Sequence, residues 1–182
     1  RFLTANFPRG TGFPEISLPT KPLLTRADVE AFSIDDVTTT EIDDAFSVRV
    51  LSDGRIRVGI HIAAPGMGIS PGDAIDQLAR GRMSTVYMPG DKITMLPDEL
   101  VNQFTLAEGD ARPALSLYAT IDTADWSVIA TETVAEAVPV TTNLRHNDLD
   151  ELVTEENLSA GIGSYPHKKE IELLWQWAQV LE

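Results

Sequence analysis

The residues best suited to chemistry lie in one short stretch, residues 33–48, with the sequence SIDDVTTTEIDDAFSV. Five carboxylates lie close together there, at Asp35, Asp36, Glu41, Asp43 and Asp44. Like charges at this spacing repel one another unless a cation lies between them. The stretch is therefore either a solvated loop or a segment built around metal ions.

Apolar residues are interleaved with these acids, so the stretch is not a plain charge run. Ile42, for example, would anchor the segment against a core while the carboxylates point elsewhere. On an extended chain Glu41 and Asp43 project to one side and Asp44 to the other, so a bend near Asp43 is needed to bring them to Asp35. Several carboxylates on a rigid frame suit two Mg²⁺ ions about 3.5–4 Å apart, the arrangement used for phosphoryl transfer. On the pattern alone, a metal site and a solvated loop remain equally supported.

Composition restricts the classes of function. The 182 residues are 43% hydrophobic and 23% charged, as in an ordinary soluble globular domain. No apolar run approaches the roughly 20 residues of a membrane span, and the absence of cysteine excludes disulfides and thiolate chemistry. The net charge of −14 should repel nucleic acid unless cations or a basic neighbouring module compensate.

Two parts are expected along the chain. Residues 1–24, rich in proline and glycine, predict an extended linker from a preceding module. Residues 25–182 predict one folded region that opens with a short helical turn at Thr25. An apolar stripe on the last helix, with Ile171, Leu174 and Trp175, continues to the end of the chain, so we expect the rest of the domain beyond Glu182. Periodicity and turn signals predict strands at 45–51, 56–62, 113–121 and 128–138, and helices at 70–82, 98–106 and from 166 onward.

Two further motifs favour structural roles. The letters Gly68-Ile69-Ser70-Pro71-Gly72 match a serine-hydrolase elbow, but Pro71 has no N–H to donate to an oxyanion. We therefore expect Ser70 to cap a helix. His61 lies in an apolar strand and is expected to be a hydrogen-bonded structural residue, and the three histidines are too scattered for a zinc motif.

Four segments, in order, resemble the catalytic (RNB) domain of the ribonuclease II / ribonuclease R family. They are FSIDDVTTTEIDDAFSV, VGIHIAAP, LARGRMSTVYMPGDKITMLPDEL and LAEGDARPALSL, and the likeness runs from about Thr25 to Glu151. The resemblance implies an α/β (mixed α+β) fold of mainly antiparallel strands with flanking helices. It also implies that this chain is an incomplete fragment, the N-terminal half of that catalytic domain.

Members of this family are processive, metal-dependent exoribonucleases that degrade single-stranded RNA from the 3′ end to nucleoside 5′-monophosphates. By this resemblance Asp35, Asp43 and Asp44 match three of the family's four active-site aspartates, and Glu41 stands where the remaining one usually is. All four would bind Mg²⁺, or Mn²⁺ in its place, with Asp43 and Asp44 as the catalytic positions. The extra methylene of Glu41 moves its oxygen by about a bond length, which would weaken activity or loosen the second metal ion.

Five further residues are matched to RNA-binding positions by the same resemblance. Tyr87 matches a tyrosine that packs near the 3′-terminal nucleotides, and stacking of this kind contributes about 1–3 kcal/mol per base. Arg80, Arg82 and Arg112 match basic positions of the motifs, which either contact phosphate or brace the acidic loop. His146 falls where the bacterial enzymes often have a tyrosine.

The resemblance also implies partners. These are single-stranded RNA, the remainder of the RNB domain, and flanking S1 or cold-shock modules that grip RNA with basic grooves and aromatic side chains. We expect a cytoplasmic protein without a membrane partner. Two alternatives to an active exoribonuclease stay open: a catalytically impaired RNB-like module that binds RNA or protein, with Glu41 and His146 as its signs, and an acidic protein that binds only divalent cations.

Overall fold

The computed structural model of the protein describes residue 7 and residues 10–181. The chain divides into two compact units. The larger comprises Leu23–Ala64 and Phe104–Glu182, and the smaller comprises Arg1–Pro22 and Pro65–Gln103. Residues 1–6 and 8–9 of the predicted linker lie outside the described residues, and residues 12–25 form neither helix nor strand.

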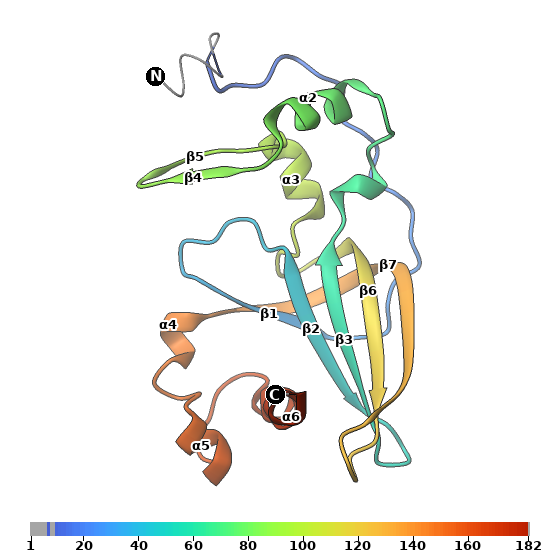
Figure 1. The fold of residues 1–182 in the computed structure, drawn as a ribbon, viewed down its shortest axis with the longest axis vertical. Coiled ribbons are helices and arrows are strands. Elements are labelled where there is room, and N and C mark those ends of the chain that lie inside the picture. Colours follow the sequence, from blue (N-terminus) through green and yellow to red (C-terminus); the bar gives the residue numbers. More distant parts are fainter. Residues whose placement is uncertain (1–6, 8–9, 182) are drawn as a thin grey trace. The chain divides into compact units, whose positions relative to one another are not determined.

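The larger unit is built on a closed barrel of five strands (Figure 1). These strands are β1 (Ala31–Asp35), β2 (Asp44–Val50), β3 (Ile56–Ala63), β6 (Ala111–Ile121) and β7 (Val128–Arg145). Neighbours in the order β1-β2-β3-β6-β7 pair antiparallel, and a parallel pairing of β1 with β7 closes the barrel. The expected mixed fold of mainly antiparallel strands is confirmed; β1 is the barrel strand that the sequence pattern missed.

The segment before β1 is extended, so the helical turn predicted at Thr25 was wrong. Arg26 forms an isolated parallel bridge with Ala137 of β7. The Ala27 N–H donates to the Ala137 carbonyl at 2.9 Å, and the Ala137 N–H donates to the Thr25 carbonyl at 2.9 Å. The segment thus continues the line of β1 along one edge of β7.

The barrel interior contains an apolar cluster and a polar centre. The apolar cluster consists of Ala27, Ala31, Ile42, Ala45, Leu106, Ala114, Val138 and Val140. At the polar centre His61 is completely buried, with its Nε2 2.8 Å from Ser47 Oγ and its Nδ1 2.7 Å from Ser116 Oγ. The prediction that His61 is a hydrogen-bonded structural residue is confirmed. Gly59 fits beside it because a Cβ there would lie 2.5 Å from Ser47 Oγ and 2.7 Å from His61 Nε2.

Three helices complete the larger unit: α4 (His146–Leu149), α5 (Glu155–Ala160) and α6 (Lys168–Leu181). Ile171 and Leu174 of α6 pack in a cluster around Phe32 of β1, and Trp177 packs against the cluster around Ile56 of β3. The predicted apolar stripe is therefore real at its start, whereas Leu181 at its end is 66% exposed. No helix among the described residues is long and apolar enough to cross a membrane.

The smaller unit contains a 3-10 turn (Pro65–Met67), α2 (Ala74–Arg82), a hairpin of β4 (Val86–Met88) and β5 (Asp91–Ile93), and most of α3 (Asp98–Phe104). The sequence pattern located both helices, though α2 begins later than predicted and α3 ends earlier. The hairpin falls in a segment for which the sequence pattern predicted neither a helix nor a strand.

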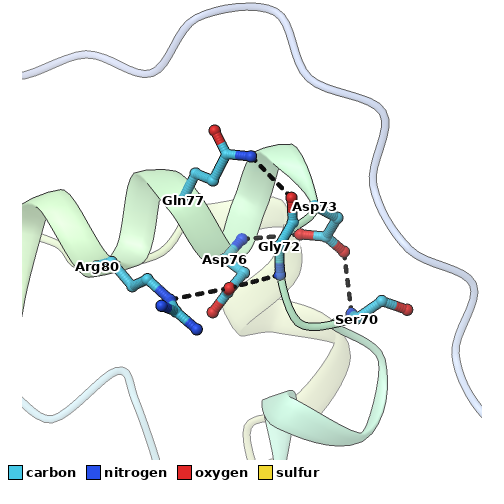
Figure 2. A network of polar contacts seen from close by, with 6 residues as sticks. All are labelled: Ser70, Gly72, Asp73, Asp76, Gln77 and Arg80. Atoms are coloured by element: carbon cyan, nitrogen blue, oxygen red, sulfur yellow. Dashed lines mark hydrogen bonds and ion pairs between the residues drawn. The ribbon is translucent and has the colours of Figure 1, made fainter.

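Asp73 caps α2, so the prediction that Ser70 is the cap was wrong. The Asp73 carboxylate accepts from the Asp76 N–H at 2.8 Å and from the Ser70 N–H at 3.0 Å (Figure 2). Gly72, whose φ is 88°, turns the chain between Ser70 and Asp73. Its N–H donates to the Asp76 carboxylate at 2.7 Å. A left-handed φ is compatible with glycine and delays the helix start to Ala74.

Candidate active site

The acidic stretch lies where β1 ends and β2 begins. Asp35 is the last residue of β1, Asp44 is the first residue of β2, and residues 36–43 form the loop between them (Figure 1). Because β1 and β2 are antiparallel neighbours, the end of one and the start of the other lie at the same rim of the barrel. The loop provides the change of direction that the sequence required near Asp43.

A buried isoleucine fixes this loop to the rest of the barrel unit. Ile42 is 3% exposed, its N–H donates to Thr105 Oγ1 at 2.7 Å, and its carbonyl accepts from the Leu106 N–H at 2.9 Å. The next carbonyl, of Asp43, accepts from the Ala63 N–H at 2.8 Å. The anchoring predicted from the interleaved pattern is confirmed, and Asp43 itself remains exposed.

Asp35 and Asp44 interact through their charges. Desolvation of its carboxyl group, followed by the negative charge of Asp35, raises the pKa of Asp44. The Asp35 carboxylate accepts from Ser33 Oγ, and Ser33 Oγ accepts in turn from Asn143 Nδ2 at 2.9 Å. This chain of hydrogen bonds orients Asp35 from two strands. Sequence analysis missed Ser33 and Asn143, although Ser33, two positions before Asp35 in a strand, shares its face.

Asp36 has a different role from its neighbours, because it shapes the turn. Its carboxylate accepts from the N–H of Thr38 at 2.9 Å and from Thr38 Oγ1 at 2.7 Å. These hydrogen bonds lower the pKa of Asp36, and the positive charges of His146 and Arg145 add to the effect. Arg145 Nη1 also donates to the Asp36 carbonyl at 2.8 Å. Sequence analysis missed Arg145, which only the pairing of β1 with β7 brings opposite Asp35.

The structure brings together two of the four predicted metal-binding carboxylates. Among the residues that it describes, no group of three or more His, Asp or Glu side chains is placed to hold one metal ion. The full set of Asp35, Glu41, Asp43 and Asp44 therefore stays a prediction. The donors fit Mg²⁺ chemically, because this ion prefers carboxylate oxygens. A cation would also relieve the repulsion between Asp35 and Asp44 that contributes to the raised pKa of Asp44.

Three of the residues matched to RNA-binding positions lie in the smaller unit, and two of them are accessible. Tyr87 in β4 is 72% exposed, so its ring is open to stacking. Arg80 lies on an exposed face of α2, where its Nε is 3.0 Å from Asp76 Oδ2 (Figure 2). An exposed pair of this kind contributes little to stability, so Arg80 can exchange its partner.

Arg82, the third of these residues, uses its guanidinium to bind backbone carbonyls within the smaller unit. Its Nη1 donates to the Thr94 carbonyl at 2.8 Å, and its Nη2 donates to the carbonyls of Thr11 and Gly12 at 2.7 and 2.9 Å. The guanidinium carbon also lies 3.7 Å from the centre of the Phe13 ring. Of the two roles that the sequence left open, the structure gives Arg82 a bracing role, although it braces residues 11–13 rather than the acidic loop.

Arg112 and His146 lie in the barrel unit. Arg112 in β6 has an 18% exposed side chain, and its Nη2 is 3.5 Å from Asp110 Oδ2. His146 is the exposed first residue of α4. Its positive charge contributes to the lowered pKa of Asp36, so it lies near the acidic loop.

Comparison with known proteins identifies the family. A family model described as the RNB domain matches residues 26–182. An uncharacterized ribonuclease of Synechocystis is 37% identical over 127 residues, which cover 69% of this chain and 19% of that protein. Exoribonuclease 2 of Cronobacter sakazakii is 41% identical over 96 residues, which cover 50% of this chain and 15% of that protein. The chain thus spans a fifth or less of the length of these relatives.

Solved structures share the fold at lower identity. RNase R of Mycoplasma genitalium, in complex with ribose-methylated single-stranded RNA, has a TM-score of 0.67 at 17% identity and aligns over 82% of this chain and 23% of its own. Yeast Ssd1, described as a pseudonuclease, has a TM-score of 0.68 at 24% identity over 78% of this chain and 19% of its own. With its family model matched over most of its length, this chain belongs to the RNB domain family.

Proposed function

We propose that this chain is the N-terminal half of the catalytic domain of a processive 3′→5′ exoribonuclease, which hydrolyses single-stranded RNA to nucleoside 5′-monophosphates with two Mg²⁺ or Mn²⁺ ions. The observation that carries the proposal is the placement of Asp35 and Asp44 at one rim of the barrel, close enough for the charge of Asp35 to raise the pKa of Asp44, in a member of the RNB family. Like charges held together by a rigid frame favour a divalent cation over bulk water.

The chain's own residues would contribute position and charge. Ser33 and Asn143 hold the Asp35 carboxylate in one orientation, and the anchored Ile42 limits the freedom of Glu41 and Asp43. When bound, Mg²⁺ supplies an activated water and stabilises charge on the phosphodiester oxygens. Tyr87, with its exposed ring, would stack on bases near the 3′ end without regard to sequence.

Most of the RNA-binding surface would lie outside this chain. With a net charge of −14, the chain repels a polyanion except where cations intervene. We propose that the remainder of the RNB domain and flanking S1 or cold-shock modules provide the basic surface, in a cytoplasmic protein.

The test uses the full-length protein that carries this chain and uniformly labelled poly(A). Asp43→Asn should abolish release of mononucleotides in Mg²⁺ while RNA binding is retained, and EDTA should abolish release by the parent. The matched control is Asp36→Asn, which changes the same charge in the same loop but keeps an oxygen that can accept from Thr38. Equal turnover by Asp43→Asn and the parent would overturn the proposal.

Glu41 supports a second candidate, a catalytically impaired RNB-like module that binds RNA or another protein. Glutamate at this position moves the carboxylate by about a bond length, and catalytic sites tolerate little displacement. The same assay separates the two. Absence of turnover by the parent, with turnover gained in Glu41→Asp, would favour the impaired module.

A further inference from the structure

Arg145, the last residue of β7, lies beside the rim of the barrel that carries the acidic stretch. It is the Cα partner of Asp35 in the parallel pairing of β7 with β1. Partners in this pairing share one face of the sheet, as the hydrogen bond between Ser33 and Asn143, also partners, shows. In Figure 1 the end of β7 passes into α4 on the same side of the barrel as the loop between β1 and β2.

The guanidinium of Arg145 is held in place by only one of its three nitrogens. Nη1 donates to the Asp36 carbonyl at 2.8 Å and to the Thr39 carbonyl at 3.4 Å, which uses both of its N–H groups. Within the described part of the chain, Nε and Nη2 have no hydrogen-bond partner and are not buried. These two nitrogens form the fork of parallel donors with which arginine binds two oxygens of a phosphate. The anchored Nη1 therefore fixes a fork that stays open.

The positive charge of Arg145 is also not neutralised by an ion pair with any described acid. In a chain with a net charge of −14, such a cation attracts a phosphate to a rim that otherwise repels it. Arg112 in the same unit is less suited, because its Nε is buried and its Nη2 lies 3.5 Å from Asp110 Oδ2. The proposed function places an RNA strand at this rim, and the inference drawn from Arg145 rests on it.

We propose that the Nε and Nη2 edge of Arg145 binds one phosphate of the RNA strand beside Asp35 and Asp44, while Nη1 braces the loop between them. Arg145 is then a substrate-binding residue. The brace and the contact depend on each other, because the two carbonyls that hold Nη1 set the direction of the opposite edge. The contact is to the backbone of the strand, so it carries no preference for base sequence.

The experiment measures binding of 5′-fluorescein-labelled oligo(A) to the full-length protein, with Ca²⁺ in place of Mg²⁺. Each linkage near the 3′ end is replaced in turn by a neutral methylphosphonate. At one linkage the replacement should weaken binding by the parent about tenfold but binding by Arg145→Gln less than about twofold, because the variant has already lost that contact. The slope of log Kd against log salt should also be smaller in the variant, by about 0.7.

Two further variants separate a phosphate contact from a change of charge or of loop structure. Arg55→Gln makes the same change of charge in the turn between β2 and β3, at the opposite end of these strands, and should keep the tenfold penalty of the parent. Arg145→Lys keeps the charge and a donor for the loop carbonyls but has no fork, so it should reduce the penalty at the same linkage. This variant decides the matter if Arg145→Gln does not fold.

The inference is overturned if Arg145 variants weaken all the oligonucleotides by one common factor, since bracing alone predicts that result. It is also overturned if no linkage shows a penalty that depends on Arg145, or if Arg55→Gln removes the penalty as well. Calorimetric titration with inorganic phosphate forms a further arm. Binding of inorganic phosphate that depends on Arg145, without any effect of linkage, would assign the fork to a free anion instead of RNA.

This inference and the proposed function fail separately, because binding is measured without turnover. A linkage penalty that depends on Arg145, in a protein that releases no mononucleotides, would support the phosphate contact and overturn the proposed hydrolysis. Release of mononucleotides by a protein in which no penalty depends on Arg145 would do the reverse.

Discussion

His61 allows a quantitative prediction about the stability of the barrel. The pKa of His61 is lowered from 6.5 to about 4, chiefly by burial; the negative charge of Glu136 opposes the shift, and the positive charge of Arg57 adds to it. In the unfolded chain the imidazole takes up a proton near its ordinary pKa, whereas in the folded barrel it stays neutral until the pH is much lower. The folded state is therefore favoured above about pH 6.5 and loses stability as the pH falls towards about 4.

The size of the effect follows from the shift. The difference between 6.5 and about 4 corresponds to about 3 kcal/mol in total, of which about 2 kcal/mol is lost between about pH 7.5 and about pH 5. His61→Gln removes the titrating group but keeps a polar amide between Ser47 and Ser116. We expect the variant to be less stable than the parent at neutral pH and to lose about 2 kcal/mol less on acidification.

Two measurements check this. Urea unfolding at the two pH values gives the free energy of unfolding for the parent and the variant, so that carboxylates common to both cancel in the comparison. NMR titration of the imidazole gives the pKa directly. The reasoning is refuted if the parent and His61→Gln lose the same stability, or if His61 titrates near 6.5 in the folded protein.

Three other substitutions test the packing and capping described above. Gly59→Ala should destabilise the barrel by about 1–3 kcal/mol in urea unfolding, because its Cβ would meet Ser47 Oγ and the pinned His61 ring; an unchanged midpoint would contradict the close approach. Asp73→Ala should cost about 1 kcal/mol through loss of the α2 cap, seen as faster amide exchange at the start of that helix. Arg82→Gln should cost more than Arg80→Gln, about 1–3 against less than 1 kcal/mol, because only Arg82 binds backbone carbonyls; equal losses of thermal stability would refute the bracing role.

Local signals in the sequence were sufficient for much of the fold. Alternation and an Asp53-Gly54 turn located β2 and β3, and the burial of Ile42 followed from its place among the acids. The prediction of Ser70 as the cap was wrong because Asp73, three residues later, can cap the same helix. Asp73 takes this role because Gly72 adopts a positive φ of 88° and delays the start of the helix.

Features that depend on distant pairing could not be predicted. Ser33, Asn143 and Arg145 reach the acidic rim only because β1 lies beside β7, and nothing in either segment alone specifies that neighbour. Likewise, the sequence motif that contains Arg82 does not indicate that its guanidinium donates hydrogen bonds to the carbonyls of Thr11 and Gly12, about 70 positions earlier in the chain.

The parallel pairing that closes the barrel has a consequence for how the protein is made. Ser33 and Asn143, joined across that seam, are 110 positions apart in the chain. A ribosome must release nearly the whole of this region before the seam can form, and closing so long a loop carries an entropic cost. Until then the first three strands form an incomplete sheet with unpaired edge strands. Unpaired edges promote aggregation, so we expect this interval of synthesis to be the one in which the chain is most prone to aggregate and in which chaperones matter most.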